Sequence, residues 1–179
     1  MADAPFALSE PLLVLHQAVI SSLLRIDVPK PTLTEPWAAL ANSMQPGVAL
    51  AWTYPELARD MAAKDRPDRS RAFKRLIDAL SLPRGSIAFL PCCAASAPND
   101  SAHTDFFQML RIVRPGAVVF FGMEDSAALR SLRAQTIPGV SIATAPGPDE
   151  LSSLADPDFS QLVHRLRTVA QDLRGGANP

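Results

Sequence analysis

Short apolar runs alternate with stretches of helical period along most of the chain. From Gly47 onward, four apolar runs are bounded by Pro or Gly, as buried strands commonly are, at Val48–Trp52, Ile87–Leu90, Ala117–Phe121 and Val140–Thr144. Between and after these runs, apolar residues recur at the spacing of one helix face, at Arg69–Leu80, Ala102–Val113, Asp125–Leu132 and Asp158–Leu173. The pattern therefore predicts four strands that alternate with helices.

This alternation predicts the fold class. A strand that is followed by a helix and then by another strand favours a right-handed crossover and a parallel sheet with helices on both faces. We expect an α/β protein, a three-layer α/β/α sandwich with about four parallel strands. It should occupy residues 47–174, with a tail at 175–179.

The first 46 residues follow a different pattern. Ser9 is a good N-cap, and apolar residues at helical spacing predict a helix that ends near Ile26. Asp27–Pro36 is rich in proline, which favours an extended arm, and a helical turn follows at Trp37–Met44. An apolar helix and an exposed Trp37 are frequent docking devices, so we expect a protein partner here. The alternative is that the helix packs on the sheet as an extra layer.

Composition narrows the class of protein. The chain has 179 residues, of which 47% are hydrophobic and 20% charged, so it can form one folded domain and is not a disordered acidic or polybasic chain. Its net charge of -1 gives no global attraction to DNA or to an anionic membrane. Apolar runs too short for a bilayer and an acidic start predict a cytoplasmic protein without membrane contact. The only cysteines, Cys92 and Cys93, are too few for a structural zinc or iron–sulfur site, so we expect no metal and no cofactor.

Candidate ligand-binding residues follow the strands, because ligands of open parallel sheets bind at the carboxyl ends of the strands. The candidates for such a cleft are Trp52, Thr53, Tyr54, Glu56, Cys92, Gly122, Ala145 and Pro146. The aromatic residues Trp52 and Tyr54 offer faces for stacking on a base or peptide, and the alternative for Trp52, which we favour, is that it caps the core. Gly122 permits close approach of a phosphate, or serves a turn.

Three residues are candidates for catalysis. Glu56 is a candidate general base, or a first-turn helix residue favoured by the helix dipole. Cys92 is a candidate nucleophile with a lowered pKa, or a buried inert thiol. His103 is the histidine best placed for a cleft, or a surface residue.

Three segments carry a family resemblance. Ala72–Leu82 is similar to the helix that follows the first strand of a known family. Ile87–Asp100 is similar to that family's second strand and to the Pro-rich, often Cys-bearing loop after it. Leu110–Leu129 is similar to the family's succession of a helix, an Arg-Pro pair, an apolar strand, a glycine and an Ala-rich helix. Over roughly residues 48–173 the chain resembles the uracil-DNA glycosylase-like superfamily, most closely its bacterial single-domain branches. A weaker resemblance is to the psi subunit of the bacterial clamp loader, which has a catalytically silent version of that fold and binds its partner through an N-terminal arm.

The departures from the family bear on activity. The family's first motif supplies Gly, a carboxylate or amide, and Pro, where this chain has Trp52-Thr53-Tyr54-Pro55-Glu56. The family's His-Pro-Ser motif corresponds to Ala145-Pro146-Gly147, and alanine neither donates a hydrogen bond nor titrates. Glycosidic cleavage needs a group that positions water and a donor for the departing base. The resemblance therefore implies a catalytically silent or strongly diverged member.

One stretch of the chain is basic. Arg59–Arg75 holds seven basic and three acidic residues, a local net charge of 7 - 3 = +4. The residues expected to contact nucleic acid are Arg66, Arg69, Arg71, Lys74 and Arg75. The alternative is a solvated helix face.

These observations lead to one functional hypothesis and two alternatives. The leading hypothesis is a protein that acts by binding nucleic acid or a replication or repair partner, as a DNA-binding or DNA-repair protein. The alternatives are an enzyme of different chemistry in the same cleft, using Glu56, Cys92 or His103, and a protein-interaction module.

Overall fold

The computed structural model describes residues 33–63, 67–93, 100–135 and 137–175. The chain separates into two units, residues 1–32 and 33–179. The expected helix at Ser9–Ile26 and the candidate Arg66 lie outside the described residues. The compact unit begins at Leu33, so it includes a helix that the sequence pattern placed in the arm before residue 47.

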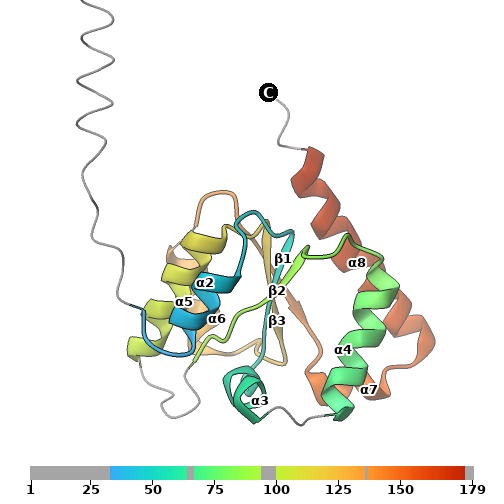
Figure 1. The fold of residues 1–179 in the computed structure, drawn as a ribbon. Coiled ribbons are helices and arrows are strands. Elements are labelled where there is room, and N and C mark those ends of the chain that lie inside the picture. Colours follow the sequence, from blue (N-terminus) through green and yellow to red (C-terminus); the bar gives the residue numbers. More distant parts are fainter. Residues whose placement is uncertain (1–32, 64–66, 94–99, 136, 176–179) are drawn as a thin grey trace, which may run out of the picture. The chain divides into compact units, whose positions relative to one another are not determined.

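The unit is built on a sheet of four parallel strands in the order β2-β1-β3-β4 (Figure 1). The strands are β1 Leu50–Thr53, β2 Ile87–Phe89, β3 Ala117–Phe121 and β4 Ser141–Ala145. In register, Leu50 of β1 lies opposite Ile87 of β2 on one side and Ala117 of β3 on the other. The prediction of an α/β protein with a parallel sheet of about four strands is confirmed.

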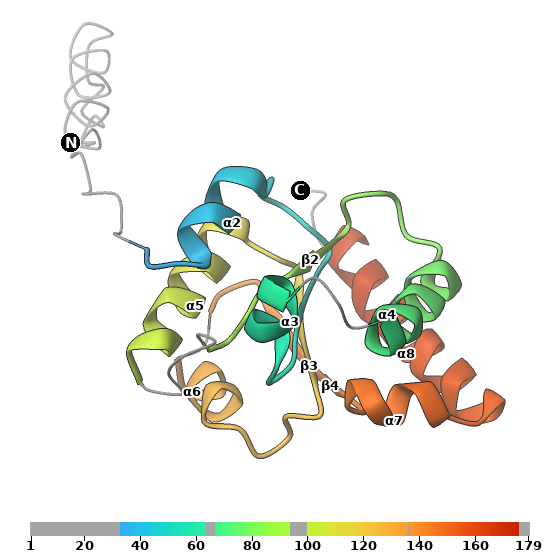
Figure 2. The ribbon, with the colours of Figure 1, turned by 60° about the horizontal axis from the view of Figure 1, so that its bottom comes forward.

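Helices cover both faces of the sheet, consistent with the three-layer arrangement (Figures 1 and 2). One face is covered by α2 Trp37–Ser43, α5 Asp100–Val113 and α6 Ala127–Gln135, and the other by α4 Pro67–Leu80 and α8 Asp156–Gly175. Two short helices, α3 Leu57–Ala63 and α7 Pro148–Ser153, directly follow β1 and β4. Neither short helix was predicted, because six or seven residues contain too few turns for a periodic pattern.

The central strands are buried on both faces. All residues of β1 and β3 are buried, with Val118 and Phe120 in the core under α5 and Val119 and Phe121 in the core under α4. Alternate side chains of a strand point to opposite faces, so a strand covered on both sides becomes wholly apolar. This explains why β3 reads as an unbroken apolar run.

Trp52 is part of this core. Its ring lies 5.6 Å from that of Phe73, 5.6 Å from that of Phe89 and 5.2 Å from that of Phe121, measured between centroids, and it has no exposed surface. The prediction that Trp52 stacks on a ligand is therefore wrong, and the alternative of a core residue is correct. The neighbouring Thr53 is also fully buried.

Trp37 anchors α2 to the rest of the fold. It is fully buried, and its indole Nε1 donates a hydrogen bond of 2.8 Å to the carbonyl oxygen of Pro91. Just before α2, both the backbone N–H and the hydroxyl of Thr34 donate to the Asp105 carboxylate of α5. The prediction of an exposed Trp37 that docks a partner is wrong, because the side chain is used within the fold.

Among the described residues, no helix is long and apolar enough to cross a membrane.

Truncating Trp37 tests this anchoring. Trp37→Ala should lower the free energy of unfolding by about 3–5 kcal/mol, because it empties a buried site and leaves the Pro91 carbonyl without its donor. Urea unfolding followed by circular dichroism measures the change, and Met61→Ala, at an exposed residue, should cost less than about 1 kcal/mol. A loss at Trp37 no larger than the loss at Met61 would contradict the burial of α2.

Candidate functional site

The loops after β1, β3 and β4 line a cleft of about 760 Å³, here called the edge cleft. Three of the predicted candidates, Gly122, Ala145 and Pro146, meet there. The other residues that line it are Pro55, Met123, Glu124, Asp125, Ser126, Glu150 and Arg165. The cleft thus lies at the carboxyl ends of the strands, where ligands of parallel sheets bind.

Gly122 is explained by close packing at the base of the edge cleft. Its φ is +63°, and a Cβ atom there would lie 2.9 Å from the Cα of Gly147. Its N–H donates to the carbonyl oxygen of Ala145 at 2.9 Å. A side chain would be both strained and in collision with the loop after β4, so Gly122 meets the requirement of a turn.

The polar groups of the edge cleft are mostly acidic. Glu124, Asp125 and Glu150 stand against one cation, Arg165. Two of these groups are engaged within the fold, since Glu150 accepts the N–H of Gly147 at 3.1 Å and Arg165 donates to the carbonyl oxygen of Thr144 at 2.7 Å. Such a lining is unfavourable for a phosphate backbone.

Ala145 occupies the position at which the resemblance places a histidine. It is buried, with 2% of its surface exposed. His103, the histidine singled out from the sequence, is half-buried near the start of α5 and is not among the residues that line the edge cleft. Among the described residues, no histidine therefore lies with the acidic groups of the edge cleft.

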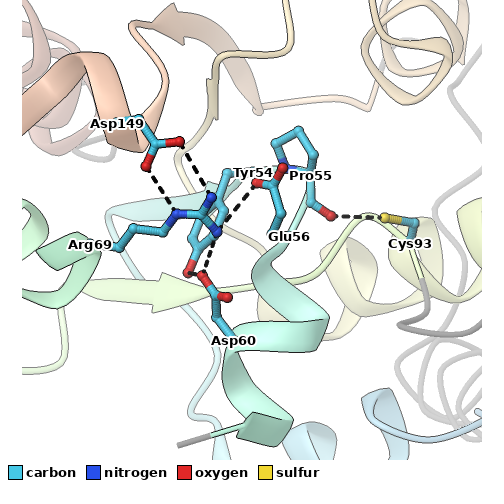
Figure 3. A network of polar contacts seen from close by, with 7 residues as sticks. All are labelled: Tyr54, Pro55, Glu56, Asp60, Arg69, Cys93 and Asp149. Carbon is cyan, nitrogen blue, oxygen red and sulfur yellow. Dashed lines mark hydrogen bonds and ion pairs between the residues drawn. The ribbon is translucent and has the colours of Figure 1, made fainter. Parts of the chain in front are cut away.

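A charged cluster, the Arg69 network, ties the elements beside this edge together (Figure 3). The Arg69 guanidinium lies 3.0 Å from Asp60 Oδ2, 3.2 Å from Asp149 Oδ1 and 3.7 Å from Glu56 Oε2. Tyr54 completes the network by donating its hydroxyl to Asp60 Oδ2 at 3.1 Å. The network joins the loop after β1 to α3, α4 and α7. Glu56 and Arg69 thus take part in a structural ion-pair cluster.

Tyr54 is held as a protonated phenol. It is buried, and its ring stacks on Phe73 with 5.2 Å between centroids. Burial, followed by the charge of Asp60 and the hydrogen bond to it, raises the pKa of Tyr54 well above its usual value. The hydroxyl therefore donates to Asp60 throughout the neutral range.

The remaining cations of α4 also meet carboxylates. Arg71 lies 2.6 Å from Asp68 and Lys74 lies 3.2 Å from Asp78. Arg75 lies 3.1 Å from Asp156 of α8, and its guanidinium carbon is 3.9 Å from the ring centroid of Phe159. The four cations of α4 are thus offset locally by acidic residues, two of which, Asp149 and Asp156, are distant in sequence. Contact with nucleic acid at these residues stays a prediction.

The two cysteines differ sharply in environment. Cys92 is buried, and contact with Cys93, then burial, raise its pKa. The prediction of a nucleophile with a lowered pKa at Cys92 is therefore wrong. Cys93 is only half-buried, its Sγ lies 3.4 Å from the carbonyl oxygen of Pro55, and its contact with Cys92 lowers its pKa to about 7. Of the two thiols, Cys93 is therefore the better candidate for a reactive one, and no pattern in the sequence distinguishes it from Cys92.

A second hollow, the β2 groove, lies between α3, α4 and β2. Its volume is about 500 Å³, and it is lined by Tyr54, Asp60, Met61, Arg69, Ser70, Phe73, Lys74, Ile77, Asp78 and Phe89. Apolar and aromatic side chains predominate among its uncharged residues, whereas two carboxylates and two cations contribute charges that cancel. Met61, with 38% of its surface exposed, is the large apolar residue that the described structure leaves most open to solvent.

Fold and site together define an α/β protein with a parallel four-stranded sheet, an acidic cleft at the carboxyl edge and an apolar groove beside the edge strand β2. Neither a scan against protein-family models nor a search of curated proteins finds a match to the chain.

The environment of Tyr54 is open to direct titration, because it is the only tyrosine in the chain. The alkaline change in ultraviolet absorbance should have its midpoint above pH 10, the usual value for tyrosine, and return to about 10 in concentrated urea. Since the folded pKa is raised, the unfolded chain loses the proton first, and stability should fall as the pH rises above about 10. A native midpoint at or below 10 would contradict the buried hydrogen bond to Asp60.

The two thiols should react at different rates. In the native protein, iodoacetamide should modify Cys93 before Cys92, with a rate that rises with pH around a midpoint near 7. Mass spectrometry of the digested protein locates the label. Cys93→Ser should remove the fast reaction, whereas Cys92→Ala should keep the label on Cys93 but move the midpoint of its rate to higher pH, because the contact that lowers the Cys93 pKa is lost. Equal reactivity in denaturant serves as the control. Faster modification of Cys92 in the native protein would refute the assignment.

Proposed function

We propose that this protein is a non-catalytic binding protein on a uracil-DNA glycosylase-like scaffold and that it binds an extended apolar segment of a partner protein in the β2 groove. The observation that carries the proposal is the groove itself, with its aromatic lining, balanced charges and exposed Met61 beside an edge strand. The family resemblance supports a partner from DNA replication or repair.

The carboxyl edge supports a role without catalysis. Ala145 stands where the resemblance would place the histidine donor. Glu56, the candidate base, is ion-paired with Arg69, and Cys92 is buried with a raised pKa. Glu56 and Cys92 are thus engaged within the fold, Ala145 offers no donor, and His103 does not line the edge cleft.

The edge of β2 supports an extended ligand. The carbonyl oxygen of Ser86 accepts the N–H of Leu50, and the N–H of Leu90 donates to the carbonyl oxygen of Trp52. The backbone groups of Ser86 and Leu90, at the two ends of β2, therefore face β1. Backbone groups alternate sides along a strand, so Ile87 and Phe89 direct theirs away from β1. Among the described strands, β2 pairs with β1 alone. An added strand from a partner would satisfy such outward groups, as in β-strand addition.

Charge favours a peptide over a nucleic acid. Asp60 and Asp78 balance Arg69 and Lys74 around the β2 groove, and Arg71 and Arg75 are paired with carboxylates nearby. Unpaired cations gain affinity for a phosphate backbone because they release the counterions condensed on the nucleic acid, and pairing with carboxylates reduces that gain. An apolar side chain gains by leaving water for a groove lined with aromatic rings.

Crosslinking tests the partner site. A photoreactive amino acid at position 61 or 77, introduced into the full chain in cells of the source organism, should crosslink the same protein from both positions. The matched control is position 133, an exposed residue of α6 on the opposite face of the sheet. Met61→Asp should reduce capture of that protein from position 77 by at least about tenfold, whereas Met61→Leu should preserve it. No shared partner, or equal capture from position 133, would overturn the proposal.

DNA titration tests the alternative. Fluorescent single-stranded DNA and uracil-containing duplex should bind only weakly at low salt, and no base should be released. Binding that falls steeply with salt and is lost in a triple variant with Arg71, Lys74 and Arg75 changed to Gln would establish nucleic acid as the ligand instead. Release of uracil would overturn the non-catalytic assignment.

A further inference from the structure

Three sulfur atoms from two loops meet beside the edge cleft. Cys92 and Cys93 follow β2, and Met123 follows β3. Cys92 Sγ lies 3.8 Å from Met123 Sδ and 4.0 Å from Cys93 Sγ. Sequence reasoning counted only the two cysteines as sulfur ligands, because Met123 is brought to them by the pairing of strands in the sheet.

We propose that Cys92, Cys93 and Met123 form a binding site for a single Cu(I) ion. Thiolate and thioether sulfurs are soft ligands, and soft ligands select Cu(I) among the biological metals. Structural zinc takes four ligands, usually cysteine, histidine or carboxylate, and the described residues contain no cluster of three or more such side chains. Three sulfurs without a nitrogen or oxygen ligand therefore suit a three-coordinate monovalent ion.

The spacing of the sulfurs fits this coordination. With metal–sulfur bonds of about 2.3 Å, a planar three-coordinate ion needs its ligands about 4.0 Å apart. The two separations that involve Cys92, 3.8 and 4.0 Å, are close to this value. Cys92 is thus placed as the ligand shared by both pairs, and the site closes when the side chains of Cys93 and Met123 turn toward the same ion.

Binding balances without a redox step. The ion enters as Cu(I), the Cys92 and Cys93 thiols each release one proton to solvent, and Met123 binds through a sulfur lone pair. Without a cation, the buried Cys92 thiolate would be costly, whereas a bound metal ion deprotonates a coordinating thiol. Two thiolates and one Cu(I) leave a single negative charge on the site.

The site has a route of entry. Met123 and Pro55 both line the edge cleft, and the half-buried Cys93 donates its thiol toward the carbonyl oxygen of Pro55 at 3.4 Å. Glu124 and Asp125 of the same cleft make its field favourable for a cation. The acidic lining that disfavours phosphate is therefore suited to the approach of a metal ion. This inference is independent of the proposed partner binding.

A competition titration tests the site. The full-length reduced protein, under anaerobic conditions, should withdraw one equivalent of Cu(I) from its bicinchoninate complex, and X-ray absorption should show three sulfur neighbours at about 2.3 Å. Cys93→Ser and Met123→Leu should each weaken the affinity by at least about tenfold. Met109→Leu, the same change at a buried methionine of α5, should leave it unaltered, and circular dichroism checks that each variant is folded.

Three results would overturn the proposal. The wild-type protein would leave the copper with bicinchoninate, or Cys93→Ser and Met123→Leu would bind copper as tightly as wild type. Alternatively, the absorption spectrum of the wild-type complex would show only two sulfur neighbours, which would exclude Met123 as a ligand.

Discussion

The structure depends on burying the two central strands on both faces. Every residue of β1 and β3 is buried. Their apolar side chains point to both faces of the sheet, so both faces must be covered by helices for the burial of these side chains to stabilise the fold. This constraint draws α2 into the fold through Trp37 and places Trp52 among three phenylalanine rings. Both tryptophans are thereby used in packing. What remains for function lies at the carboxyl edge and beside β2.

The Arg69 network organises that remaining surface. One guanidinium contacts carboxylates of α3, α7 and the loop after β1, and so holds the elements around the β2 groove in one arrangement. The same ion pairs offset the positive charge of Arg69, and the ion pairs of Arg71, Lys74 and Arg75 offset theirs. A helix that reads as basic becomes, in the fold, part of a nearly balanced surface. This charge balance is the reason for proposing an apolar protein segment, and not DNA, as the ligand.

The carboxyl edge of the sheet carries a cleft whose lining is mostly acidic. Close packing of Gly122 against Gly147 shapes its base, and acidic groups rather than a histidine accompany Ala145. Next to it, the sulfur of Cys92 contacts the sulfurs of both Cys93 and Met123. The carboxyl edge thus offers acidic and sulfur groups to a ligand, and no described histidine lines its cleft.

The sequence by itself determined the strands and helices that build the layers of the fold. Strand and helix periods are local, so four strands and their covering helices were predicted to within a few residues, except for the short helices α3 and α7. Only the tertiary structure decided the site. Arg69 meets Asp149, Arg75 meets Asp156, Trp37 meets Pro91 and Met123 meets Cys92, all far apart in the chain. Such contacts arise from strand order and helix packing, which no local pattern of residues encodes.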